Sequence, residues 1–255
     1  MKVRVLGCSG GIGQGVATTS FLIDDDILID SGTGVCDLTL TEMRKIKHIF
    51  ITHSHLDHIV SIPLLVDTLF DSLIGNPLTI HAQRSTIKIL REHIFNWAIW
   101  PDFTVLPHKT NAVMKFVGMK GGETKKIDGR SIEMITVNHS VPGVGYRVQS
   151  KRKSFAFSGD TTSNENLWAS LNKHRNLDLL FVESAFANKD MDLARVAFHY
   201  CPQLLGADLP KLKHRPDVYI SHLKPGEEKL IMKECKQALP EWDVQQLYSG
   251  DVFTL

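Results

Sequence analysis

An apolar run that stops at a dense histidine cluster constrains this chain more than any other feature. Residues 49–51 are good strand formers without a charge, so they predict a buried β-strand. His53, His55, Asp57 and His58 follow directly. A tight turn after the strand would bring these four side chains to one point. Imidazole and carboxylate together suit Zn, Fe or Mn, so the H-x-H-x-D-H spacing predicts a metal site rather than a polar surface loop.

The bulk composition bounds the remaining possibilities. A chain of 255 residues is long for one average domain and short for two, so we expect a single domain over residues 1–255. The net charge is +1, with lysine and arginine scattered along the chain. Sequence-independent binding to nucleic acid is therefore not indicated, and a small-molecule substrate is the better expectation.

Cysteine usage and hydropathy predict a cytoplasmic protein. Cys8, Cys36, Cys201 and Cys235 lack C-x-x-C spacing and a dense framework, which indicates reduced thiols that pack in the core. The N-terminus lacks the apolar core of a signal peptide. No segment approaches the roughly 20 apolar residues of a membrane helix, so no membrane partner is expected.

A glycine-rich loop over residues 7–15 follows the first predicted strand. It matches neither a G-x-G-x-x-G fingerprint nor a phosphate-binding P-loop. Its glycines either form a simple turn or expose backbone N–H groups that line a cleft, and the sequence leaves both readings open.

Strands and helices alternate along the whole chain, which predicts an α/β (α+β) fold. Strands are expected at 2–7, 17–23, 26–30, 49–51, 78–81, 113–117, 123–127, 131–137, 145–149, 154–157, 177–182, 218–220 and 244–247, and helices at 37–45, 59–70, 83–95, 164–173, 201–213 and 227–238. The aromatic segment 96–103, with Trp97 and Trp100, is either core or a base-stacking wall; core packing is the favoured interpretation.

Three further predicted strands also end in metal-binding side chains. His139, Asp160 and His222 each follow such a strand, and they can meet the first cluster at one edge of the sheets.

With these seven positions filled, the chain resembles the metallo-β-lactamase fold superfamily. The resemblance implies a four-layer αββα sandwich with a two-metal site at one edge. It implies that the first metal binds His53, His55 and His139, and that the second binds Asp57, His58 and His222. Asp160 would bridge the two. The ions are expected to be divalent, with zinc as the first choice and manganese or iron as alternatives.

Within that superfamily the chain is most similar to the class II 3′,5′-cyclic-nucleotide phosphodiesterases. The similarity rests on residues 52–58, on the segment 94–101 and on Ser221-His222-Leu223-Lys224-Pro225. It implies hydrolysis of cyclic AMP or cyclic GMP to the 5′-monophosphate. Two divalent ions about 3.5 to 4 Å apart can activate a shared water as the hydroxide nucleophile, with Asp57 and Asp160 as the catalytic carboxylates that hold them.

A proton donor would help the ribose 3′-oxygen to leave. His199, Glu183 and His81 are candidates because each lies near the end of a predicted element. Each also has a structural alternative. His81 can orient a ligand, Glu183 can fix a histidine tautomer, and His199 can be an ordinary surface or partly buried residue.

Other functions remain open at this stage. A transfer-RNA 3′-processing endonuclease would share the motifs, although residues 115–126 are short for the basic, glycine-rich arm expected of that branch. A non-catalytic dimetal sensor would be expected to lack a ligand, and none is missing. Another small phosphodiester or a phosphonate is a third substrate class. The sequence leaves open whether the chain is a monomer or a homodimer.

Overall fold

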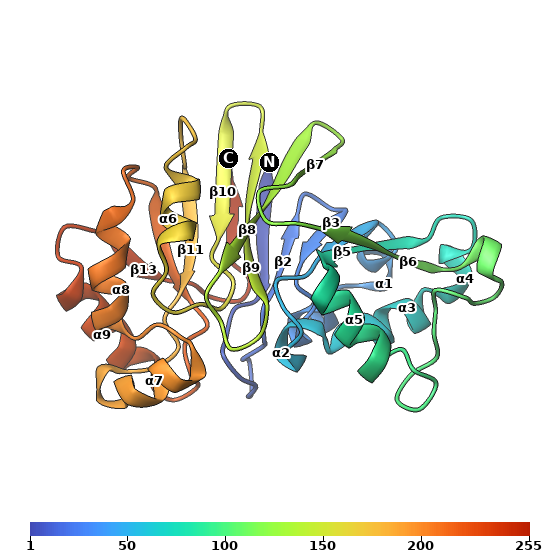
Figure 1. Cartoon of the computed structure of the whole chain (residues 1–255), viewed down its shortest axis with the longest axis horizontal. Coiled ribbons are helices and arrows are strands. Elements are labelled where there is room, and N and C mark those ends of the chain that lie inside the picture. Colours follow the sequence, from blue (N-terminus) through green and yellow to red (C-terminus); the bar gives the residue numbers. More distant parts are fainter.

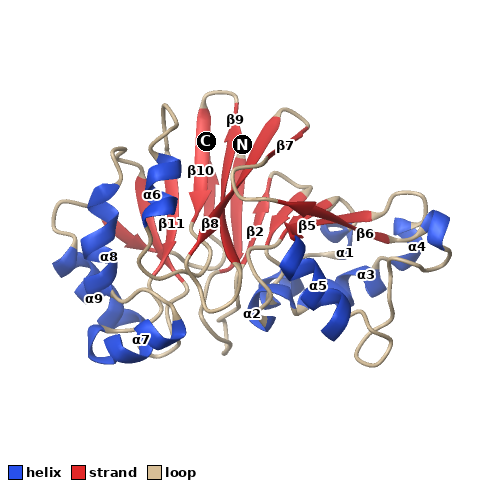
Figure 2. Cartoon of the chain, in the orientation of Figure 1, coloured by secondary structure: helices blue, strands red, loops and turns tan.

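The computed structural model describes residues 1–255 and contains two seven-stranded mixed sheets packed face to face. Helices cover the outer face of each sheet (Figures 1 and 2). This is the four-layer αββα sandwich that the resemblance implied.

The first sheet has the strand order β14-β1-β2-β3-β4-β5-β6. Its strands are β1 (Lys2–Gly7), β2 (Ser20–Ile23), β3 (Ile27–Ile29), β4 (His48–Phe50), β5 (Leu78–Gln83), β6 (Met114–Met119) and β14 (Val252–Thr254). The helices of this half are α1 (Leu40–Met43), α2 (Leu56–Ile59), α3 (Ser61–Thr68), α4 (Phe70–Leu73) and α5 (Arg84–His93).

The second sheet has the strand order β13-β12-β11-β10-β9-β8-β7. Its strands are β7 (Thr124–Ile127), β8 (Arg130–Val137), β9 (Gly143–Ser150), β10 (Lys153–Phe157), β11 (Leu179–Glu183), β12 (Asp217–Ser221) and β13 (Val244–Gln246). The helices of this half are α6 (Glu165–Leu171), α7 (Met191–Ala197), α8 (Pro202–Asp208) and α9 (Glu228–Ala238).

Side-chain alternation along the strands separates the core into three layers. In β4, Phe50 faces the central layer between the sheets, while Ile49 packs with the helices of the first half. In β11, Phe181 faces the same central layer, and Leu180 packs with the helices of the second half. Such strands are buried on both faces, which explains why they read as continuous apolar runs.

The strand directions position the candidate site. Strands β10, β11 and β12 are parallel, and β8 runs the same way because both β8 and β10 are antiparallel to β9. Their carboxyl ends therefore meet at one edge of the second sheet. The turn after β4 reaches this edge from the first sheet, and Figure 1 shows α2 and α7 both along the lower edge of the molecule.

Several predicted boundaries were wrong. The helix expected at 37–45 is shortened to α1, because Thr39 forms a capping box with Glu42 and starts the helix there. The helix expected at 201–213 ends at Asp208 and continues as a short 3₁₀ turn that contains Pro210, which has no N–H to donate. Helix α7 and strand β14 were not predicted, and both are short.

All four cysteines are free thiols. Cys8, Cys201 and Cys235 are buried, whereas Cys36 is exposed and does not pack in the core.

The aromatic segment 96–103 is partly in the core and partly at the surface. Trp100 packs against the core of the first half, whereas Trp97 is 63% exposed.

No helix combines the length and apolar character that spanning a membrane requires.

Candidate metal centre

Two groups of side chains that could hold a metal converge at the shared sheet edge, and a third, His139, Asp160 and His199, overlaps both. The first group is His53, His55 and His139. The second is Asp57, His58, Asp160 and His222. In each group the donor atoms lie within 4.8 Å of one another. The structure therefore brings together all seven residues that the sequence singled out.

Asp160 lies between the two groups. Its Oδ2 is 3.7 Å from Nε2 of His53, in the first group. The same oxygen is 3.3 Å from Nε2 of His58 and 3.3 Å from Nε2 of His222, in the second group. One carboxylate that faces both groups has the placement that a bridging ligand requires.

Unpaired buried atoms test whether the site fits a metal. Nε2 of His53, Nε2 of His58 and Oδ1 of Asp160 are buried and have no hydrogen-bond partner. An unpaired buried polar atom costs about 1–3 kcal/mol, so three in one cluster need a compensating partner. Imidazole nitrogens and a carboxylate oxygen are the donor set that Zn²⁺, Mn²⁺ and Fe²⁺ accept, and the residues fit such ions.

Burial keeps several of the imidazoles neutral, which is the form that binds metal. It lowers the pKa of His53 well below 6.5 and also lowers the pKa of His55. It lowers the pKa of His139 to about 4 and that of His222 to about 3. These side chains carry free lone pairs at neutral pH.

Without a metal ion, His58 carries a proton and forms a buried ion pair with Asp160. Burial opposes the charge on His58, but the carboxylates of Asp160 and Asp30 outweigh it and raise the pKa of His58 well above 6.5. Burial likewise opposes the charge on Asp160, but His222 and His58 lower the pKa of Asp160 well below 3.8. The carboxylate holds a proton on a neighbouring imidazole, and a divalent cation would replace that proton.

Asp30 orients His58, and sequence reasoning missed this role. Its Oδ2 is 2.7 Å from Nδ1 of His58, so Nδ1 donates and Nε2 turns toward Asp160. Thr52 fixes the carboxylate with its backbone N–H at 2.7 Å and its hydroxyl at 2.8 Å. Asp30 directly follows β3, which pairs in parallel with β4. The sequence signal for this role was an aspartate at the end of β3, the neighbour of the strand that precedes the histidine motif.

A backbone carbonyl orients His139. Its Nδ1 donates to Phe198 O at 3.0 Å, which leaves Nε2 facing Nδ1 of His55 at 3.2 Å. Phe198 has a φ of 57°, a left-handed conformation that is costly for a bulky residue. Strain of this kind persists where the surrounding structure fixes it, and here it presents a carbonyl to a candidate ligand.

His199 and Glu183 lie beside the two groups. Nδ1 of His199 is 2.8 Å from Oε1 of Glu183, and its ring centroid is 5.0 Å from that of His139 and 5.3 Å from that of His222. Burial alone would lower the pKa of His199, but Glu183 outweighs it and raises the pKa to about 9. Glu183 also accepts hydrogen bonds from the backbone N–H groups of Thr161 and Ala185.

His81 does not lie with these residues. Its Nε2 is 3.1 Å from Nδ1 of His48, and its ring stacks on Phe50 at 4.3 Å. Burial lowers the pKa of His81 to about 3. His81 is therefore a packing residue in the first sheet rather than part of the site.

The glycine-rich loop packs on His222, the last of the candidate ligands. A Cβ on Gly10 would lie 2.6 Å from the carbonyl oxygen of His222 and 3.1 Å from Cδ2 of its ring. Only glycine permits so close an approach. Of the glycines in this loop, Gly13 and Gly15 line surface cavities, whereas Gly10 is required by its close packing on His222.

Comparison with known proteins agrees with this geometry. Residues 26–234 match the family described as the Beta-lactamase superfamily domain. A Yersinia pestis protein named as a probable 3′,5′-cyclic-nucleotide phosphodiesterase is 26% identical over 92% of this chain and 83% of its own length. Ribonuclease Z of Pyrococcus horikoshii is 27% identical over 52% of this chain, and the match spans only 41% of that enzyme.

The solved structure of unliganded yeast PDE1 has the same fold, with a TM-score of 0.85 at 18% sequence identity over 100% of this chain and 99% of that one. The family match covers most of the chain, and the His and Asp groups converge at the sheet edge. The chain therefore belongs to the metallo-β-lactamase superfamily and is a metallo-hydrolase of that superfamily.

Proposed function

We propose that this protein is a two-metal phosphodiesterase that hydrolyses a 3′,5′-cyclic nucleotide to its 5′-monophosphate. The observation that carries the proposal is the placement of Asp160 between two complete groups of ligands. A site for two adjacent metals suits phosphodiesters in particular, because attacking and leaving oxygens can both be stabilised.

The chain offers three ligands to each ion and one that is shared. His53, His55 and His139 would hold the first. Asp57, His58 and His222 would hold the second, with Asp160 common to both. Zn, Mn or Fe ions bound there would supply Lewis-acid stabilisation of the phosphate and an activated water.

His199 is the proposed proton donor to the leaving 3′-oxygen. Its Nδ1 is engaged with Glu183, so the proton that it can transfer is held at Nε2. With a pKa of about 9, the ring carries that proton at neutral pH. Glu183 is buried and holds the ring by charge and hydrogen bonding, which makes it a positioning residue.

Two observations support a small cyclic substrate. The similarity to the Yersinia pestis protein extends over 92% of this chain. Residues 115–126, which an RNA-processing enzyme would use as a basic arm, instead form the sheet strands β6 and β7 with a short turn between them. A small-molecule phosphodiester is therefore the proposed partner.

Transfer-RNA 3′ processing is the second candidate. The partial match to ribonuclease Z favours it, and the same ligand set would serve its chemistry. A non-catalytic sensor is less favoured, because no ligand of either group is missing.

Parallel hydrolysis assays would separate these functions. Metal-reconstituted protein should turn over cyclic AMP or cyclic GMP, and also bis-p-nitrophenyl phosphate, with release of the 5′-monophosphate from the nucleotide. Cleavage of precursor tRNA without turnover of cyclic nucleotides would overturn the proposal in favour of RNA processing. Turnover of none of these substrates by protein that retains its metals would favour the sensor.

A further inference from the structure

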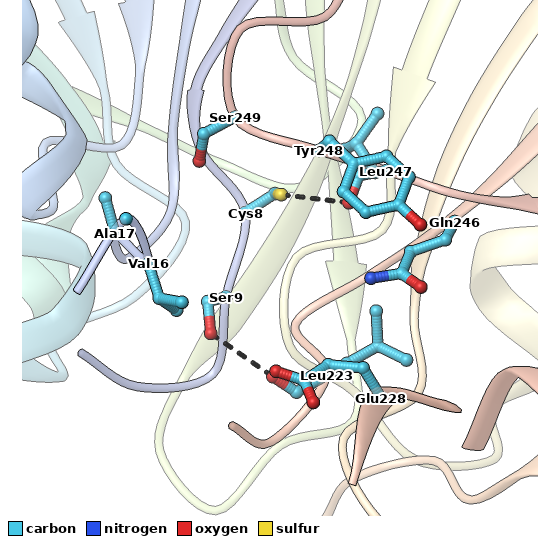
Figure 3. A pocket seen from close by; sticks show the side chains of 11 residues that line it. Cys8, Ser9, Val16, Ala17, Leu223, Glu228, Gln246, Leu247, Tyr248 and Ser249 are labelled. Atoms are coloured by element: carbon cyan, nitrogen blue, oxygen red, sulfur yellow. Dashed lines mark hydrogen bonds between the residues drawn. The ribbon is translucent and has the colours of Figure 1, made fainter. Parts of the chain in front are cut away.

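A small cavity lies next to the metal centre and is not used by the proposed reaction. It has a volume of about 80 Å³ and is formed by the ends of β1 and β12, the start of α9 and the segment after β13. Val16 and Ala17 form one side of it, and the Tyr248 ring faces them across the opening (Figure 3). Leu223 and Leu247 add apolar surface.

Three polar groups at this cavity form no hydrogen bond within the chain: the Gln246 amide, the Tyr248 hydroxyl and Oε1 of Glu228. Figure 3 shows Tyr248 and Gln246 on one side of the cavity and Glu228 at its lower end. An apolar pocket with a few convergent polar groups has the usual composition of a small-molecule site.

The charge of the lining restricts the ligand. No lysine or arginine lines the cavity, and Glu228 is its one charged side chain. A phosphate or carboxylate would have no counter-ion here. A neutral group that donates hydrogen bonds to the carboxylate is favoured.

The side chains at the cavity match one nucleobase, adenine, better than guanine. A glutamine amide pairs with the exocyclic amine and ring nitrogen of adenine through two hydrogen bonds, and a carboxylate accepts from an exocyclic amine. The ring of Tyr248 is 57% exposed and offers a face for stacking. Guanine would instead call for arginine or lysine at its acceptor edge, and neither is present.

We propose that this cavity binds the adenine ring of a nucleoside, with Gln246 and Glu228 reading its amino edge and Tyr248 stacking on its face. The site is separate from the seven candidate metal ligands and does not depend on the function proposed above. The ribose would extend toward solvent, so the ligand needs no phosphate.

Titration calorimetry on the metal-loaded protein tests this proposal, with adenosine as the ligand. Inosine, which has an oxygen in place of the amine, should bind at least roughly tenfold more weakly, since one lost base contact costs about 1–3 kcal/mol. The double variant Glu228→Gln, Gln246→Leu should weaken adenosine binding by roughly tenfold or more for the same reason. Ala17→Phe, which places a ring in the cavity, should abolish binding.

Gln245→Leu is the matched control, because Gln245 is exposed and alternates with Gln246 in β13. It should bind adenosine as the unaltered protein does. Melting temperature and metal content would verify that each variant is folded. Adenosine binding that is unchanged in both the double variant and Ala17→Phe would overturn the proposal, as would equal affinity for inosine or no binding at millimolar adenosine.

Discussion

Asp160 is buried and contacts both groups of candidate ligands, so its removal should affect both proposed ions. Asp160→Ala leaves the two groups without the carboxylate that lies between them. We expect it to lose most bound metal and, as an order-of-magnitude estimate, at least 10³-fold in phosphodiesterase activity. Elemental analysis of the purified variant measures the first effect. Full metal content together with full activity would show that Asp160 is not the shared ligand.

Asp30 would act on the metal indirectly, through its hydrogen bond to His58. Asp30→Asn keeps the size of the side chain but removes its charge, and it leaves one acceptor oxygen where the carboxylate uses two, for Nδ1 of His58 at 2.7 Å and for the Thr52 backbone N–H. Metal affinity should fall about 10- to 100-fold, as when other partners of histidine ligands are lost. Competition with a coloured chelator measures the affinity. An affinity equal to that of the unaltered protein would mean that His58 does not need this partner.

The proposed role of His199 predicts a dependence on the leaving group. His199→Gln should reduce kcat for a cyclic nucleotide about 10²- to 10⁴-fold, because the ribose 3′-oxygen leaves as an alkoxide unless it is protonated. Hydrolysis of bis-p-nitrophenyl phosphate should fall far less, because p-nitrophenolate is stable without a proton. Equal losses on both substrates, or a parallel loss of metal, would assign His199 a structural role instead.

At the scale of elements, a partly buried ion cluster joins the two sheets. Arg130 begins β8 of the second sheet and is 6% exposed. Its guanidinium lies 2.6 Å from Asp26 and 3.1 Å from Asp24, in the turn between β2 and β3 of the first sheet. The hydrogen bonds to Asp26 are bidentate, at 2.6 and 2.8 Å, which is the strong form of this interaction.

Arg130→Ala should therefore lower the free energy of unfolding by about 3 kcal/mol, because it leaves the partly buried carboxylate of Asp26 without its charged partner. Urea unfolding measures the change. Lys45→Ala is the matched control, since Lys45 pairs with Asp25 in the same turn, but both side chains are more than half exposed. That variant should unfold like the unaltered protein, and equal losses in the two variants would contradict the argument.

The same cluster predicts a pH dependence of stability. Burial opposes the charge on Asp26, but Arg130 outweighs it and lowers the pKa of Asp26 below 3.8 in the folded protein. The unfolded chain then binds the proton more tightly. The stabilisation by Asp26 is complete above about pH 4 and decreases as the pH falls through the folded pKa. Asp26→Asn should remove this part of the acid sensitivity in urea titrations between pH 5 and pH 3.

At the scale of the whole molecule, the proposed adenine cavity and the candidate metal centre share a wall. The His222 backbone has a left-handed φ of 60°, and its N–H donates to Cys8 O at 2.6 Å. Ser9 and Gly10 both donate to Leu223 O, at 3.3 and 3.0 Å. Since Cys8, Ser9 and Leu223 line the cavity, a ligand there would brace the segment that presents His222.

This arrangement predicts that adenosine and metal stabilise one another. At saturating adenosine, the metal affinity measured by competition with a chelator should rise by roughly fivefold, for a coupling at the low end of the usual range. Ala17→Phe should make the metal affinity insensitive to adenosine. An adenosine effect that persists in Ala17→Phe, or an unchanged affinity in the unaltered protein, would show that the two sites are not coupled through this wall.

The amino-acid sequence determined the identity of the seven clustered residues and the type of fold. The H-x-H-x-D-H spacing keeps four side chains close together through the covalent chain alone. A strand such as β4 is buried on both faces and therefore needs a continuous run of apolar residues, which can be recognised in the sequence. His139, Asp160 and His222 were found because each follows a strand, a local signal that survives without knowledge of pairing.

Only the tertiary structure decided which other residues meet these seven. Asp30 and Phe198 are ordinary in the sequence, and they reach His58 and His139 because strand pairing and a left-handed turn place them there. The same long-range packing moved His81 into a buried pair with His48, although it also lies near the end of a predicted strand. Local patterns specify the elements, whereas contacts between distant segments depend on how the sheets pair and pack, which no short window of sequence contains.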